Sequence, residues 1–274
     1  MKPVNNLSRF VFWGILWAVL PPTLLAPVIY YGLKPFWKRQ IPSSPMLYIF
    51  CLGVATISTF YIFASPILSI FDISVAEAAS LILPLTFILE VILILLIIQL
   101  FSRYPDWQTY LPFKSIHWSP KFILTIILSA SPLAVFFASS ESIVKINGIT
   151  PIHPLLVVMD HAYLYSNWIA YSFGFLALAV SGPIIEELIF RGLALYGSQS
   201  QSNKFVRFSI YFIVSIVFGL AHFPVSFVFP VLFSFFLIWM KNSSQSLWPC
   251  IISHMLWNTS VGLVWTFLIF KPIS

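Results

Sequence analysis

The stretch HAYLYSNWIAYSFGFLALAVSGPII, residues 161–185, contains no aspartate, glutamate, lysine or arginine. A helix needs roughly 20 apolar residues to cross the hydrocarbon core of a bilayer. Because backbone groups in lipid must be hydrogen-bonded within their own segment, we interpret this stretch as helical. Further runs with almost no charge are 10–33, 40–71, 121–140, 208–240 and 242–270.

The composition of the whole chain agrees with a membrane protein. Of the 274 residues, 59% are hydrophobic and 8% are charged, and the mean hydropathy is +0.96. A soluble domain carries about 25% charged residues, so these charges could not cover a water-facing surface. The lysines and arginines are scattered over loops, which argues against a nucleic-acid partner. Cys51 and Cys250 lie inside apolar runs and are expected to be small buried residues rather than a disulfide.

The sequence therefore predicts an all-α fold, a polytopic transmembrane bundle of about eight helices forming one membrane domain over residues 1–274. Residues 1–150 would be N-terminal spans, and 155–270 the core that holds a polar catalytic cluster inside the bundle. We expect a multi-pass integral membrane protein, in the plasma membrane if the cell is prokaryotic. The expected helices are 10–33, 46–71, 78–101, 121–139, 155–181, 183–198, 206–222, 225–240 and 247–270.

Prolines and positive loops refine this arrangement. Pro183 is expected to begin a helix, where its missing N–H costs little, and Pro224 to divide the run 208–240. Pro21 and Pro22 should kink the first span. Positive loops prefer the cytoplasm, which places 34–45 and 102–120 on that side.

Ionisable residues in apolar context are costly and usually face a polar interior. Most of those in this chain fall in three short segments, which makes these segments the candidate site. For Glu90, in the predicted helix 78–101, we expect a structural partner or a water-lined cavity. The whole set is Glu90, Asp160, His161, Glu186, Glu187, Arg191, His222 and His254.

The first segment is GPIIEELIFRG, residues 182–192. On a helix Glu187 and Arg191 are i and i+4, so they share a face and can pair. Glu186 lies about 100° round the helix and is free to work as a general base. A buried ion pair that only holds helices together is the alternative interpretation.

The other two segments carry imidazoles. His222 ends FGLAH, residues 218–222, and by itself would suit a structural role at a helix end. His254 and Asn258 share one face of a helix. They could donate hydrogen bonds to an oxyanion, bind a metal, or bond a neighbouring helix.

These motifs, in this order and with Gly192 after Arg191, resemble the CPBP family. This is the family of CAAX prenyl endopeptidases and bacteriocin-processing membrane proteases, also called the ABI family. The resemblance covers roughly residues 170–270. It implies an intramembrane endopeptidase acting on a lipidated (CAAX-type) or hydrophobic peptide. In such a protein Glu186 would activate water, His222 would help to hold it, Glu187 with Arg191 would orient the site, and His254 with Asn258 would form the oxyanion hole.

Several alternatives stay open at this stage. A zinc-dependent version would use Glu186, His222 and His254, with an open position for water. We favour a site without a cofactor, because asparagine is a poor zinc ligand and Arg191 disfavours a nearby cation. A transport protein would fit helices broken at prolines, but no pair of matching halves is present. A non-catalytic immunity or scaffold protein is the third alternative. The expected partners are the lipid bilayer and the peptide substrate.

Overall fold

The computed structural model describes residues 75–102, 108, 111–114, 118–128, 154–196, 203–222 and 228–269. These residues form helices and turns and include no strand, which confirms the all-α class. The chain divides into two compact units, Met1–Ala78 and Ala79–Ser274, and the described residues lie almost wholly in the second. The expected helices 10–33 and 46–71, the kink at Pro21 and Pro22, the division at Pro224 and most of the positive loops lie outside the described residues.

Two described stretches are long and apolar enough to cross a membrane. One is Ala79–Gln99, within helix α3 (Val75–Ser102), and the other is Trp168–Leu193. The shorter helix α10 (Val228–Ser244) is also apolar. α3 turns large apolar side chains outward, with Leu81 65% and Leu95 60% exposed. An apolar outer surface of this kind suits lipid and not water.

The predicted helix 155–181 is wrong as a single element, because the chain breaks it near its middle. Helix α6 (Pro154–Leu164) ends in a turn where Ser166 adopts a left-handed φ of 55°. The N–H of Asn167 then closes the turn on the carbonyl of Ala162 at 2.8 Å. Helix α7 (Trp168–Leu176) starts afresh, and the side chain of Asn167 caps it by accepting from the N–H of Ala170.

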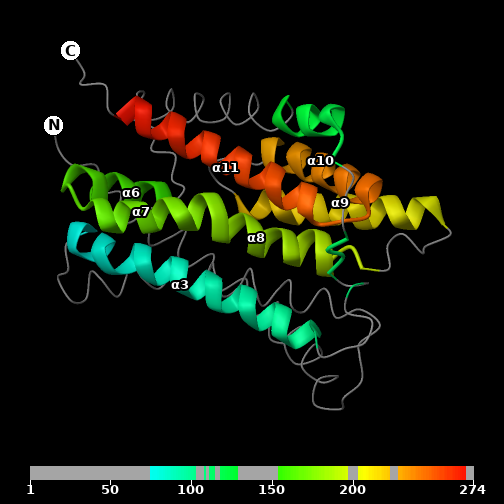
Figure 1. Ribbon diagram of the computed structural model, residues 1–274, viewed down its shortest axis with the longest axis horizontal. Helices are drawn as coiled ribbons and strands as arrows, with labels where there is room; N and C mark the ends of the chain where they lie inside the picture. The colour runs from blue at the N-terminus through cyan, green and yellow to red at the C-terminus, as the bar shows by residue number, and fades with distance from the viewer. Residues whose placement is uncertain are drawn as a thin grey trace. The chain divides into compact units, whose positions relative to one another are not determined.

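Pro183 lies in the first turn of a short α-helix, as predicted, but no break precedes it, because the chain before it is already helical. α7 continues through a π-helical turn η1 (Ala177–Ser181), helix α8 (Gly182–Glu187) and a second π-helical turn η2 (Leu188–Leu193), as one column in Figure 1. The N–H of Gly182 reaches back to the carbonyl of Ala177, five residues earlier. Proline inside a helix lacks an N–H and crowds the preceding turn. Because the turn before Pro183 is widened, the column accommodates the proline without ending.

Further helices are α9 (Lys204–Ala221), α10 and α11 (Trp248–Ile269), close to the predicted 206–222, 225–240 and 247–270. α10 packs against α9 and α11, and α11 lies along the column at η1 and α8 (Figure 1). At the η1 level, a Cβ on Gly262 would come within 2.9 Å of the ring of Phe175, so α11 and the column approach closely. Tyr171 and Thr266 form a further hydrogen bond between them.

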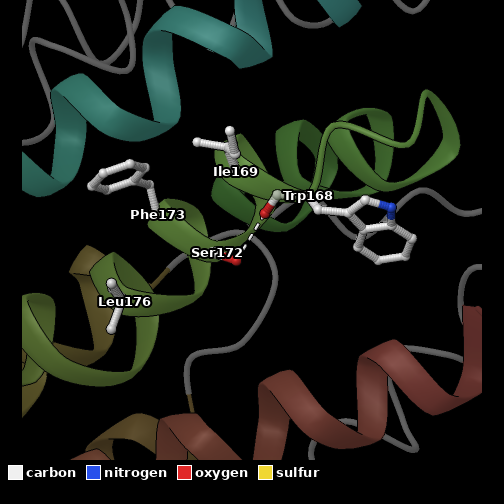
Figure 2. Close-up of a pocket in the computed structure, with 5 residues that line it drawn as sticks. All are labelled: Trp168, Ile169, Ser172, Phe173 and Leu176. Carbon is white, nitrogen blue, oxygen red and sulfur yellow. Dashed lines mark hydrogen bonds between the residues drawn. The ribbon is translucent and has the colours of Figure 1, made fainter.

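The outer face of α7 carries a shallow apolar hollow. It is lined by Trp168, Ile169, Ser172, Phe173 and Leu176 (Figure 2). The hydroxyl of Ser172 donates to the carbonyl of Trp168 at 2.8 Å, so the polar group in the hollow is satisfied within its own helix. None of the candidate site residues lines this hollow.

Candidate active site

Glu187 joins two of the three motifs. Its Oε1 accepts a hydrogen bond from Nη1 of Arg191 at 2.9 Å, as the i,i+4 spacing predicts, and another from Nδ1 of His254 at 2.8 Å. Glu187 and Arg191 have no exposed surface, and His254 is 1% exposed. A carboxylate buried this fully requires charge and hydrogen-bond partners, and Glu187 obtains them from the column and from α11.

The Arg191 guanidinium is enclosed by aromatic rings. Its Cζ lies 4.4 Å from the centroid of Phe218 and 5.7 Å from that of Phe190, a favourable arrangement for a desolvated cation. Among the described residues, Nε and Nη2 of Arg191 and Oε2 of Glu187 have no hydrogen-bond partner. Buried polar atoms are nearly always paired, so the cluster keeps hydrogen-bonding capacity that the described side chains do not use.

Glu186 has the opposite environment from its neighbour. Its side chain is 27% exposed, against none for Glu187. Its Oε2 lies 3.8 Å from Nε2 of His254, beyond hydrogen-bond distance, and has no partner among the described residues. Glu187 is therefore held in a close ion pair with Arg191, as the helical geometry of the motif predicts, whereas the contact of Glu186 with His254 is longer.

The His254 ring is oriented by its contacts. An ionised Glu187 can only accept, so Nδ1 of His254 carries a proton. In the neutral ring Nε2 is then an unprotonated acceptor, and it faces Glu186. The edges of Phe218 and Phe233 pack against the ring, with centroids 5.7 and 5.6 Å away. His254 can therefore donate from Nε2 to an oxyanion only when the ring carries both protons.

His222 stands at the end of α9. Its Nδ1 donates to the carbonyl of Phe218 at 2.8 Å, which is the helix-end contact that the sequence allows for. It forms no hydrogen bond or ion pair with Glu186 or His254 among the described residues. Its link to the site is the ring of Phe218, whose centroid lies 4.7 Å from that of His222.

Asn258 uses one of its two amide protons in a hydrogen bond to a neighbouring helix. Its Nδ2 donates to the carbonyl of Leu178 in η1 at 2.8 Å, so the interhelical role considered from the sequence is present. The second N–H of the same nitrogen remains a possible oxyanion donor.

Phe218 is the residue that sequence reasoning missed. It is 1% exposed, and its ring contacts Arg191, His222 and His254. It therefore connects all three motifs, although it carries no polar group. The available signal was its place as the first residue of the second motif.

The described side chains do not form a metal site. No group of three histidine, cysteine, aspartate or glutamate side chains among them converges as ion ligands. The Nδ1 atoms of His222 and His254 are both hydrogen-bonded to protein acceptors, which leaves Nε2 as the ring nitrogen that could bind an ion. The alternative zinc set Glu186, His222 and His254 is not brought together as ion ligands among these residues.

Part of the chain matches a known protein family. Residues 168–260 match the family model described as Rce1-like type II CAAX prenyl endopeptidase. This range runs from the start of α7 into α11 and includes the residues of all three motifs, which are Glu186, Glu187, Arg191, His222, His254 and Asn258. No curated protein and no solved structure matches the chain. The family match confirms the resemblance predicted from the three motifs: over residues 168–260 this chain is similar to the Rce1-like CAAX prenyl endopeptidases, a family of membrane proteases.

Proposed function

We propose that the chain is an intramembrane endopeptidase that hydrolyses a peptide bond in a lipidated or hydrophobic peptide. The observation that carries the proposal is the spatial arrangement of Glu187, His254 and Glu186. Glu187 holds Nδ1 of His254, and Nε2 of the same ring faces the free carboxylate of Glu186 at 3.8 Å. A carboxylate, an oriented imidazole and a second acid are the parts that general acid–base hydrolysis needs.

In this proposal the hydrolytic water lies between Glu186 and His254. One oxygen can be at hydrogen-bond distance, about 2.8 Å, from two atoms that are this far apart. Glu186 accepts a proton as the water O–H bond breaks and the new C–O bond forms at the scissile carbonyl. The pair of electrons of the carbonyl double bond moves onto oxygen, which becomes the oxyanion.

The oxyanion and the leaving group use the remaining residues. Asn258 offers its second N–H to the oxyanion. His254 joins it once Glu186 has passed the proton that it took from water to Nε2, since the ring then donates from both nitrogens while Glu187 stays on Nδ1. Collapse of the intermediate breaks the C–N bond, and the same proton leaves with the amine. His222 and Phe218 line the site on the α9 side.

The substrate class follows from the surroundings and from the resemblance. A site enclosed by apolar helices favours a hydrophobic or lipidated peptide, and a prenylated CAAX protein is the substrate after which the family is named. A cell without prenylated proteins would present another hydrophobic substrate, such as a leader peptide.

The decisive experiment is cleavage of a panel of lipidated and unlipidated peptides by the purified protein, with and without a chelator. We expect Glu186→Gln to lower kcat by about 10²–10⁴-fold, the usual contribution of a general base. The matched control is Asp160→Asn, an acid on α6 outside the site, which should leave kcat unchanged. Full cleavage by Glu186→Gln would refute the mechanism, and normal cellular function of that variant would favour a non-catalytic scaffold.

A further inference from the structure

Glu90 is a buried acid that the proposed reaction does not use. It is the only charged residue in the candidate span Ala79–Gln99 and is 7% exposed. Its Oε2 accepts a hydrogen bond from the hydroxyl of Ser181 at 2.6 Å. An acid in the middle of a membrane helix costs free energy, and such residues usually have a functional role. We therefore expect a role of Glu90 other than helix packing.

Ser181 stands at a sensitive point of the column. It is 1% exposed and is the last residue of the π-helical turn η1, directly before Gly182 and Pro183. Its backbone therefore belongs to the widened turn that lets the column pass the proline. π-helical turns are frequent at functional sites, and their wider geometry needs support from the surrounding structure.

The Glu90 carboxyl also approaches Gly182. Its Oε1 would be 3.8 Å from a Cβ placed on that glycine. Gly182 and Glu186 are i and i+4, so they share one face of α8. Along α8, the Glu90 carboxyl thus lies about one helical turn before the proposed base.

We propose that Glu90 is a positioning residue of the active site. Through Ser181 it holds the junction of η1 and α8, and so fixes the direction in which Glu186 points. This inference rests on the proposed function, and it needs no contact between Glu90 and the substrate. A misplacement of about 1 Å at a catalytic group can cost on the order of 100-fold in rate, which is the reason to support this turn from another helix.

The same two elements provide a matched control. Nδ2 of Asn167 donates to the Ser80 hydroxyl at 2.6 Å, and Phe87 packs on Phe173 with centroids 5.7 Å apart. These contacts also join α3 to the column. The partner of Ser80 is Asn167, which precedes Ser181 by 14 residues, and 14 residues span about 21 Å along a helix. Ser80→Ala therefore removes an exposed hydrogen bond that also joins α3 to this part of the chain, but far from the site.

The test compares Glu90→Leu, Glu90→Gln, Ser181→Ala and Ser80→Ala by two measurements on the full chain in detergent or nanodiscs. The first is kcat and KM for a cleaved peptide. The second is the rate at which a hydrophobic carbodiimide labels Glu186, followed by peptide mass spectrometry. Labelling does not depend on turnover, so it tests the position of Glu186 even if no peptide in the panel is cleaved.

We expect Glu90→Leu and Ser181→Ala to lower kcat by about tenfold or more, with little change in KM, and to change the labelling rate of Glu186. Glu90→Gln keeps an acceptor for Ser181 and should retain most of the activity. Ser80→Ala should match the wild type in both measurements. Equal loss in Glu90→Gln and Glu90→Leu, or unchanged Glu186 labelling in Glu90→Leu and Ser181→Ala, would overturn the inference. A wild-type chain that cleaves nothing would instead count against the proposed function.

Discussion

The Oε1 of Glu187 lies 2.8 Å from the Nδ1 of His254, although the two residues are 67 positions apart in the sequence. This contact ties α8 to α11 and determines which nitrogen of the imidazole faces Glu186. The same oxygen also accepts from Arg191. One carboxylate oxygen therefore orients the histidine and balances the charge of the buried arginine. Substitutions of these residues should affect the free energy of unfolding and the cleavage rate to different extents.

Removal of the arginine should destabilise the fold. Arg191→Ala leaves Glu187 buried without its cation, and we expect a loss of about 3–5 kcal/mol in the free energy of unfolding. The double variant Glu187→Leu/Arg191→Leu removes both charges and should be more stable than Arg191→Ala while remaining inactive. Denaturant unfolding in detergent, with cleavage measured in parallel, checks both points. A double variant as unstable as Arg191→Ala would contradict the electrostatic explanation.

The tautomer of His254 predicts the effect of a glutamine at this position. Glutamine can donate from a nitrogen near Nε2 but cannot accept the proton of water. If the histidine relays this proton, His254→Gln should lower kcat by about 100-fold or more. His161→Gln on α6 is the matched control and should behave as the wild type in the same assay. Near-normal cleavage by His254→Gln would mean that this position serves only as an oxyanion donor.

Gly182 should not accept a side chain. Its φ of −56° is an ordinary helical value, so the cost is steric. A Cβ there would lie 2.8 Å from the backbone oxygen of Ala177, and a backbone atom cannot rotate away. We expect Gly182→Ala to cost about 1–3 kcal/mol and to lower kcat by displacing α8.

The control for this glycine is Gly262→Ala on α11, where a Cβ would lie 2.9 Å from the ring of Phe175. It should reduce stability by a similar amount while leaving the activity per folded molecule closer to that of the wild type. Thermal unfolding and active-site titration distinguish the two variants. Equal specific activity in both would show that α8 tolerates the displacement.

Phe218 should be sensitive to loss of its ring. Phe218→Leu keeps most of the apolar volume but removes the aromatic face over Arg191, an interaction worth up to about 2 kcal/mol when desolvated. Phe218→Ala also leaves a cavity and should cost about 3–5 kcal/mol. The control Phe212→Leu changes a ring that is 48% exposed on the same helix, and its unfolding curve should overlay that of the wild type. Equal unfolding of Phe218→Leu and Phe212→Leu would rule out the aromatic contribution.

The local relationships within one helix could be predicted from the order of the amino acids. Runs without charge predict helices because backbone groups in lipid have no other hydrogen-bond partners. The pairing of Glu187 with Arg191, and the separate direction of Glu186, follow from the pitch of one helix. These features need no knowledge of what lies beside the helix, and for this reason they could be predicted from the motif.

The interruptions of the helices and the contacts between them became known from the packed fold. Proline at 183 continues the column because a π-helical turn precedes it, whereas the real break lies at Ser166 and Asn167. The contacts of Glu187 with His254, of Asn258 with Leu178, and of Glu90 with Ser181 all cross between elements. Residue periodicity specifies the face of a helix but not the register at which two helices meet, since that register depends on close packing at positions such as Gly262 and Phe175.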